Sequence, residues 1–375
     1  MLMKVALVYD WVNKYGGAER VIQALHAIWP RAPLYTAVYD RKKATWADSF
    51  KVYPSFLQNI PFAKSHHELF PFLIPLSFES FNFDEYDVVI SVTSFAAKGI
   101  ITKPKTLHLC YCLTPTRFLW SGYNEYESHP GFNLFDPVIR FFFPLISTKL
   151  RAWDFIASSR PDIYLTISET VKKRITKYYH RDATVIYPGI DCDKFLTPTA
   201  KKNSGFFLVV SRLVPYKKID IAIKAAGKLN LPLKIIGSGS QFKYLKSIAG
   251  ETIEFIKEHL TDQELVRYYQ NCAALIFPAD EDFGLAMLEA QACGKPVISF
   301  KGNSAKEIII EGVTGDFFYP QTTDALIKVL KNFNPQKYSP SVCRENVKRF
   351  DQRKFLTTFK KIVEDIWQKR QKNQI

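Results

Sequence analysis

The chain has 375 residues, of which 47% are hydrophobic, and carries a formal net charge of +15. This length and composition exclude a disordered chain and leave room for two domains with full cores. The charge calls for an anionic partner. Because the basic residues are spread along the chain without a zinc-finger, helix-turn-helix or RNA-binding signature, we expect phosphorylated substrates or anionic lipid rather than nucleic acid.

The first half of the chain alternates between strand and helix patterns, which is typical of an α/β domain. Gly16 and Gly17 precede the first helix, where the backbone can come close to a phosphate or an acceptor, although a plain turn explains the pair equally well. Ser168 is the expected cap of a later helix. We expect strands at residues 4–9, 34–38, 88–92, 107–112 and 163–167, and helices at about 18–26 and 169–179.

Residues 132–155 form an aromatic and basic stretch with two interpretations. It can rest on a membrane surface, with Arg140, Lys149 and Arg151 reaching lipid headgroups. Alternatively, it is a core or interdomain helix that Pro144 interrupts. No apolar run is long enough to span a bilayer, and the N-terminal residues read as a strand rather than a signal peptide, so we expect a cytoplasmic protein, peripheral at the inner face of the membrane.

The six cysteines show no C-x-x-C spacing, which favours reduced, structural thiols. Cys110 and Cys112 alternate on one expected strand and therefore share a face. Asp191 and Asp193 have an Asp-x-Asp form of the kind that can hold a metal ion.

A polar run at 197–205 looks like a linker, and a second α/β half follows it. Its first loop carries Arg212 and Lys217, which suit a grip on phosphate oxygens or form a solvated turn. Gly237 follows the next strand, where backbone can approach a ligand. We expect strands at 206–211 and 233–237 and helices at about 219–229, 325–332 and 352–370.

Residues 274–300 predict a strand, a helix and a second strand, at 274–277, 285–292 and 297–300. The loop between the first strand and the helix would lie at the carboxyl end of a parallel sheet, where such folds bind ligands. Backbone N–H groups at Phe283, Gly284 and Leu285 can hold an anion there. Glu281 and Glu289 flank this turn; the alternative is an acidic loop that complements the helix dipole, with Glu289 on a solvated face.

The Glu-x7-Glu spacing around Phe283-Gly284 resembles the signature of the retaining glycosyltransferases of family 4, whose fold is called GT-B. Residues 9–22 and 108–120 resemble the mannosyltransferase-like branch, which includes O-antigen mannosyltransferases. The resemblance covers nearly the whole chain. It implies an α/β protein of two Rossmann-like domains that face each other across a cleft: an N-terminal acceptor domain at 1–200, joined by the closing helix at 352–370, and a donor domain at 205–350.

The same resemblance implies roles for individual residues. Glu281 lies at the transferred sugar, Glu289 holds the ribose of the nucleotide, and Arg212 and Lys217 grip the diphosphate. No metal cofactor is implied. Arg117 could hold an acceptor phosphate, or it could stack on Phe118 or Trp120.

Two departures from the family pattern bear on substrate. Leu113 stands where the branch usually carries a histidine that touches the transferred sugar. Residues 254–262 resemble the loop beside the nucleotide base, but Lys257, Glu258 and His259 replace its usual small residues, so the base stays open.

We therefore expect transfer of a hexose, mannose by branch resemblance, from a nucleoside diphosphate sugar such as GDP-mannose. The acceptor would be a glycan or a lipid-linked acceptor in cell-surface polysaccharide synthesis. Two alternatives are a nucleotide-sugar-binding protein with impaired turnover, which Leu113 makes conceivable, and a nucleotide-sugar epimerase of GT-B type.

Overall fold

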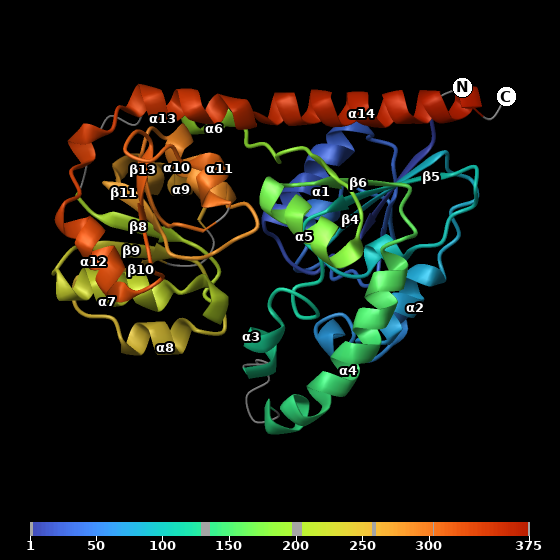
Figure 1. The fold of residues 1–375 in the computed structure, drawn as a ribbon, viewed down its shortest axis with the longest axis horizontal. Helices are drawn as coiled ribbons and strands as arrows, with labels where there is room; N and C mark the ends of the chain where they lie inside the picture. The colour runs from blue at the N-terminus through green and yellow to red at the C-terminus, as the bar shows by residue number, and fades with distance from the viewer. Residues whose placement is uncertain (1–2, 129–135, 197–204, 257–259, 303, 374–375) are drawn as a thin grey trace. The chain divides into compact units, whose positions relative to one another are not determined.

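The computed structural model describes residues 3–128, 136–196, 205–256, 260–302 and 304–373 (Figure 1). The chain divides into an N-terminal unit, Met1–Pro188 with Phe355–Ile375, and a C-terminal unit, Gly189–Lys354. Each unit is built on one sheet of parallel strands with helices packed against it. The α/β class predicted from the sequence, with two Rossmann-like sheets, is confirmed.

The N-terminal sheet has seven strands in the order β3-β2-β1-β4-β5-β6-β7, all parallel. The strands that the sequence predicts are present, whereas β3 and β7 were missed because runs of two or three residues carry no periodic signal. The strands are β1 (Val5–Tyr9), β2 (Leu34–Thr36), β3 (Val52–Pro54), β4 (Val88–Thr93), β5 (Leu107–Cys112), β6 (Ile163–Thr166) and β7 (Thr184–Val185).

Helices pack around this sheet. The cap predicted at Ser168 is confirmed, because its hydroxyl accepts a hydrogen bond from the Val171 N–H at 3.2 Å at the start of α5. The helices are α1 (Gly17–Ile28), α2 (Leu73–Glu79), α3 (Tyr123–Ser128), α4 (Asp136–Ala157), α5 (Glu169–Tyr179) and the closing α14 (Gln352–Asn373). Short 3-10 helices are η1 (Thr45–Ala47), η2 (Phe56–Asn59), η3 (His67–Leu69) and η4 (Ala97–Gly99).

The helix α4 corrects one expectation, because it runs through Pro144 without interruption. A proline removes one helical N–H and crowds the preceding turn. Pro144 is exposed, so water can satisfy the carbonyl that loses its partner, and the Ser147 and Thr148 hydroxyls bond to the Pro144 carbonyl. Throughout the described ranges, no helix has both the length and the apolar character that crossing a bilayer requires.

The C-terminal sheet has six parallel strands in the order β10-β9-β8-β11-β12-β13. The strands β11 and β12 have the predicted bounds, and β10 and β13 were missed. The strands are β8 (Phe207–Val210), β9 (Leu233–Ile236), β10 (Ile253–Ile256), β11 (Ala274–Phe277), β12 (Val297–Phe300) and β13 (Gly315–Phe318).

The segment at 254–262, expected to be a loop, is a strand in its first part. Glu254 hides the strand pattern of β10, but its side chain points outward and pairs with Lys234 on β9 at 2.8 Å. Thr261 and Glu264 then form a reciprocal cap that starts α9. Residues 257–259, which bear on the nucleotide base, lie outside the described residues.

The helices of the C-terminal unit pack on its sheet around an aliphatic core. They are α6 (Cys192–Leu196), α7 (Ile219–Lys228), α8 (Phe242–Ser247), α9 (Asp262–Asn271), α10 (Leu285–Ala292), α11 (Ala305–Ile308), α12 (Thr323–Lys331) and α13 (Pro340–Val347). Short 3-10 helices are η6 (Pro215–Lys217), η7 (Pro335–Lys337) and η8 (Lys348–Phe350).

The chain joins the C-terminal unit at Gly189, earlier than the expected boundary at residue 200. Ile190 exchanges backbone bonds with Phe350 and Gln352, and the Phe195 ring lies 6.5 Å from that of Tyr269. These contacts attach the segment to the second core before the expected linker, whose residues 197–204 lie outside the described chain.

The closing helix α14 packs on the N-terminal unit from Phe355 onward. The rings of Phe355 and Phe359 lie 6.0 and 5.3 Å from that of Tyr111 on β5, and Arg370 pairs with Asp162 at 2.9 Å. Thus the last residues of the chain complete the first core.

All six cysteines are free thiols and buried, as predicted. Burial raises the pKa of Cys343 to about 11 and those of Cys192 and Cys272 to about 12. Such thiols stay protonated at neutral pH and behave as small apolar side chains.

Candidate active site

The C-terminal sheet has a point where the chain changes the direction in which it adds strands. From β8 it proceeds outward to β9 and β10, and it then returns to β11 on the other side of β8 and continues to β12 and β13. The loops after β8 and β11 therefore leave the same edge of the sheet in diverging directions. In open α/β sheets, ligands bind at this kind of switch point.

Two predicted site residues meet there. Lys217, in η6 after β8, forms an ion pair with Glu281, in the loop after β11. Lys217 is 8% exposed. The loop that carries Glu281 is fixed by the Ser304 hydroxyl, which donates a hydrogen bond to the Glu281 backbone carbonyl. The structure thus brings a buried cation and a carboxylate, 64 positions apart in the numbering, into direct contact.

Arg212 lies in the same loop as Lys217, and Tyr216 contacts both. The Arg212 guanidinium bonds to the Tyr216 hydroxyl and lies 5.9 Å from its ring, while the Lys217 ammonium lies 5.0 Å from the same ring. The aromatic face attracts both cations and keeps them close together. Sequence reasoning missed Tyr216; an aromatic residue between two basic residues was the available signal.

The helix α10 begins at the same edge. Gly284 adopts a φ of +106°, and a side chain there would come within 2.5 Å of Met287, so the turn requires glycine. The Phe283 ring is buried and packs edge-on against Phe350 at 5.8 Å. This packing fixes the first turn of the helix, which begins at Leu285. In that turn the Met287 N–H bonds to the Gly284 carbonyl at 3.0 Å.

Glu289 lies inside α10 and is 3% exposed, so the alternative of a solvated helix face is wrong. Its Oε2 accepts a hydrogen bond from the Tyr269 hydroxyl of α9 at 2.7 Å. A buried carboxylate needs such partners, because an uncompensated charge in a protein interior is costly. Tyr269 was also missed by sequence reasoning; nothing near it in the sequence points to Glu289.

Gly237 has a packing role that the sequence did not reveal. A side chain there would come within 1.8 Å of the Ser211 carbonyl, so only glycine lets the loop after β9 approach the loop of Arg212. The Leu213 N–H also donates to the Ser238 carbonyl at 2.8 Å. Gly237 therefore supports the basic loop, and its contact with a donor stays a prediction.

The N-terminal sheet has its own switch point between β1 and β4, and Asp10 fills it. The buried Asp10 carboxylate accepts the backbone N–H groups of Ser94, Phe95, Ala96 and Ala97 at 2.8–3.1 Å. A cradle of N–H groups of this type can bind a phosphate. Asp10 already occupies this cradle, so these N–H groups are bonded within the protein.

Other predicted residues lie at the same edge of the N-terminal sheet. Gly16 caps α1 and Gly17 begins it, and the buried Glu19, held by the Tyr9 hydroxyl at 2.6 Å, lies beside Gly16. The role of Gly16 and Gly17 in binding a donor stays a prediction. Leu113 follows β5 and is half-buried, with its N–H bonded to the Thr93 carbonyl at 2.8 Å.

Arg117 lies in a loop that a buried ion pair holds. Asp154 of α4 pairs with Lys98 at 2.6 Å and accepts bonds from Thr116 at 2.6 Å, and from Trp120 and Tyr179 at 2.8 Å each. The guanidinium of Arg151 lies 5.8 Å from the Trp120 ring. The acceptor role of Arg117 stays a prediction.

Comparison with known proteins identifies the C-terminal part of the chain. A model of the family "Glycosyl transferases group 1" matches residues 194–373. These residues form a glycosyl transferases group 1 domain. The match includes Arg212, Lys217, Glu281 and Glu289.

The chain is similar to named glycosyltransferases. The chain is 26% identical over 231 residues to O-antigen chain mannosyltransferase C of Escherichia coli, covering 57% of this chain and 60% of the relative. It is 26% identical over 194 residues to D-rhamnosyltransferase WbpZ of Pseudomonas aeruginosa, covering 48% and 49%. The chain thus spans about half to three fifths of the length of these relatives.

A solved structure shares the fold of nearly the whole chain. The crystal structure of Anabaena Alr3699/HepE in complex with UDP-glucose superposes with a TM-score of 0.71 at 18% identity, over 97% of this chain and 100% of that chain. The fold is GT-B, as the sequence predicts.

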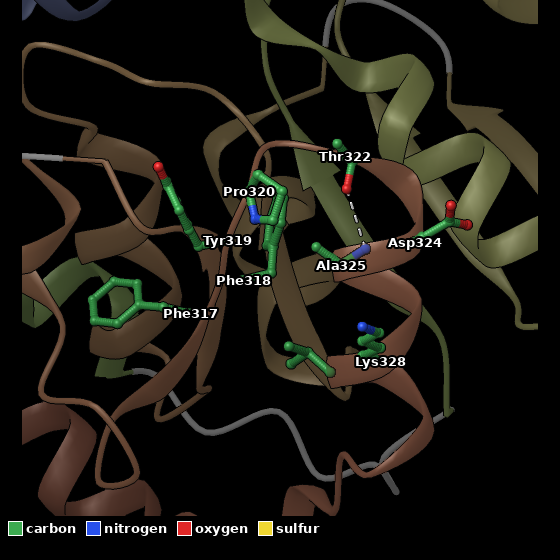
Figure 2. A pocket seen from close by; sticks show the side chains of 9 residues that line it. Phe317, Phe318, Tyr319, Pro320, Thr322, Asp324, Ala325 and Lys328 are labelled. Carbon is green, nitrogen blue, oxygen red and sulfur yellow. Dashed lines mark hydrogen bonds between the residues drawn. The ribbon is translucent and has the colours of Figure 1, made fainter.

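The group 1 domain also contains a cavity of about 340 Å³ away from the switch point (Figure 2). It lies between the end of the edge strand β13 and the helix α12, with Tyr319 and Pro320 on one side and Asp324 and Lys328 on the other. None of the predicted site residues lines it.

Asp191 and Asp193 do not meet other metal-binding side chains. Asp193 faces Arg353 at 3.4 Å, and the Asp191 carboxylate accepts the Lys194 N–H. Within the described ranges, no three His, Cys, Asp or Glu side chains cluster as a metal site.

Proposed function

We propose that the protein is a retaining glycosyltransferase that transfers a hexose from a nucleoside diphosphate sugar. The observation that carries the proposal is the contact between Lys217 and Glu281 at the switch point of the group 1 domain. If Lys217 binds the diphosphate, the Glu281 carboxylate, which pairs with Lys217, lies close to the bond between the phosphate and the sugar. Glu281 is then in position to orient the sugar and to stabilise positive charge on its anomeric carbon.

The leaving diphosphate gains negative charge as that bond breaks. Arg212, Lys217 and the first turn of α10 supply positive charge and N–H donors at that place before the reaction starts. Tyr216 keeps the two cations together although their charges repel. This arrangement neutralises the leaving group with protein groups, so we propose that transfer requires no metal ion.

For the sugar we propose mannose or a 6-deoxyhexose. One relative is named a mannosyltransferase and another a D-rhamnosyltransferase, and rhamnose lacks the 6-hydroxyl of mannose. Leu113 replaces a polar residue with an apolar one at the edge of the N-terminal sheet, which suits a donor with fewer hydroxyls. GDP-mannose is the first donor to test.

For the acceptor we propose a glycan or a lipid-linked sugar of cell-surface polysaccharide synthesis, bound by the N-terminal unit. The filled cradle at Asp10 supports this division, because it leaves the N-terminal sheet without a place for a donor phosphate. A lipid-linked acceptor would bring the enzyme to the anionic inner face of the membrane.

The test combines a donor panel with a variant of Leu113. Mannose, glucose, N-acetylhexosamine and deoxyhexose donors are incubated with candidate acceptors, and release of the nucleoside diphosphate is followed. We expect measurable transfer with at least one donor, faster for mannose in Leu113→His by about one or two decades, which corresponds to one added hydrogen bond.

Other outcomes separate the alternatives. Donor binding is seen as a rise in the thermal unfolding midpoint of the protein. If the natural protein binds donors but only the Leu113→His variant transfers sugar, the natural protein is a nucleotide-sugar-binding protein. If a donor is converted to another sugar nucleotide without an acceptor, it is an epimerase. If no donor binds, the proposal is wrong.

The variant Glu289→Gln should raise the KM for the donor about tenfold or more with little change in kcat. The substitution keeps the size of the side chain and the acceptor for Tyr269 but removes the charge that holds the ribose hydroxyls, and hydrogen bonds to charged groups contribute about 1.5–3 kcal/mol. Steady-state kinetics against donor concentration measure both constants. A fall in kcat at unchanged KM would contradict the ribose assignment.

A further inference from the structure

One face of α4 carries apolar side chains that point to solvent. Val138, Phe141, Phe142 and Leu145 are 57%, 77%, 47% and 59% exposed. Their spacing of i, i+3, i+4 and i+7 places them on one stripe of the helix, and Ala152 and Ile156 continue it. We call these six residues the outer stripe.

The opposite side of α4 is already used by the protein. Ser147, Leu150, Asp154 and Ala157 are buried against the N-terminal unit. The side of α4 that meets the core is therefore not the side that carries the outer stripe. Figure 1 shows that the first half of α4 extends beyond the N-terminal sheet, so the outer stripe lies on a projecting element.

A second element adds to this face. The helix α2 lies beside α4 and is joined to it by a hydrogen bond of 2.9 Å from Trp153 to Glu79. Leu69 and Phe72, before α2, and Leu76, within it, are also about half exposed. Large exposed apolar surfaces on a soluble protein commonly mark an interaction site.

A basic side chain, Lys149, lies among the apolar residues of the outer stripe. Lys149 is exposed and lies on the stripe itself, one turn after Leu145. Both carboxylates of α4 lie on its inner side: Asp154 is fully buried, and Asp136 is half-buried. Of the three basic residues expected to reach lipid, Arg151 instead bonds to the Leu119 carbonyl at 2.8 Å, and Arg140 bonds to the Ser128 carbonyl.

We propose that the outer stripe of α4 binds the surface of an anionic lipid bilayer. Phenylalanine and leucine side chains would enter the boundary between headgroups and acyl chains, while Lys149 meets phosphate groups. A second copy of the chain fits less well, because a symmetric contact would bring Lys149 toward its equivalent between two molecules of net charge +15.

The inference extends the proposed function by naming the surface that faces the membrane, but its test measures lipid binding and not glycosyl transfer. The protein is sedimented with vesicles of phosphatidylcholine alone or of phosphatidylcholine and phosphatidylglycerol in equal parts. We expect sedimentation with the anionic vesicles, and its loss at high salt because salt screens the charge attraction.

Variants of the outer stripe test whether this surface binds the vesicles. Phe141→Ser with Leu145→Ser should weaken vesicle binding by at least about tenfold, since each apolar side chain contributes to insertion. Val342→Ser, an exposed apolar residue on α13, is the matched control and should bind as the natural protein does. Equal binding by the two variants, or equal binding of the natural protein to both kinds of vesicle, would overturn the proposal.

A reporter variant tests the same point without removing the apolar surface. The emission of Phe141→Trp should shift to shorter wavelength with anionic vesicles and be quenched by brominated acyl chains. If the emission that this added tryptophan contributes is the same with and without anionic vesicles, the outer stripe does not enter lipid.

If the serine variant instead lowers the molar mass of the protein in solution, the stripe binds a second copy. Donor binding, followed by thermal shift, should be unaffected in every variant, so a failure of the donor site would be recognised separately.

Discussion

Replacing Lys217 with alanine should lower the rate of sugar transfer about 100-fold or more. The substitution removes a cation that is held in place before the leaving diphosphate develops its charge, and loss of one such group typically costs two to three decades in kcat. It also leaves the Glu281 carboxylate without its partner. Arg212→Ala should act in the same direction.

The control for this experiment is Lys224→Ala on α7. Lys224 forms an exposed pair with Asp220 at 2.9 Å in the same domain, and pairs of this type contribute little. Initial rates of nucleoside diphosphate release at saturating donor compare the variants. Full activity in both Arg212→Ala and Lys217→Ala would remove the diphosphate assignment.

Asp154→Ala should lower the free energy of unfolding by about 3–5 kcal/mol. Lys98 and Asp154 are 1% and 0% exposed, and removing one partner of a buried pair leaves an uncompensated charge. The hydroxyls of Thr116 and Tyr179 and the indole N–H of Trp120 lose their acceptor as well. Urea unfolding followed by circular dichroism measures the effect.

Two further variants show whether burial is the cause. Asp84→Ala breaks the exposed pair with Lys103 in the same unit and should change stability by less than about 1 kcal/mol. Lys98→Met combined with Asp154→Leu should recover part of the loss, because no buried charge remains. If Asp154→Ala is no more harmful than Asp84→Ala, the buried pair does not stabilise the loop that carries Arg117.

The central strands and the helices after them could be predicted from the sequence, because strands buried on both faces are apolar runs and Ser168 is a recognisable cap. The strand β10 could not, since Glu254 breaks its apolar run and only the neighbouring Lys234 explains the charge. Pro144 likewise reads as a helix breaker, and only its exposure shows why α4 continues.

His108 illustrates the same limit at the site. It is the one histidine in the segment that resembles the mannosyltransferase branch. The structure buries it between strands beside Ser91, at 2.8 Å, and burial lowers its pKa to about 3. It is a neutral core residue, which its place in the sequence does not reveal.

The sequence by itself determined the α/β class, the order of the main elements and the residue types of the candidate site, because apolar periodicity and the Glu281–Glu289 spacing are local properties. Only the tertiary structure decided which of these residues meet. Lys217 contacts Glu281 because β8 and β11 are neighbours at a change of chain direction, Tyr269 reaches Glu289 from another helix, and Asp154 is satisfied by groups from three separate segments. Strand order and the burial of charge depend on contacts between residues far apart in the chain, and no local pattern records them.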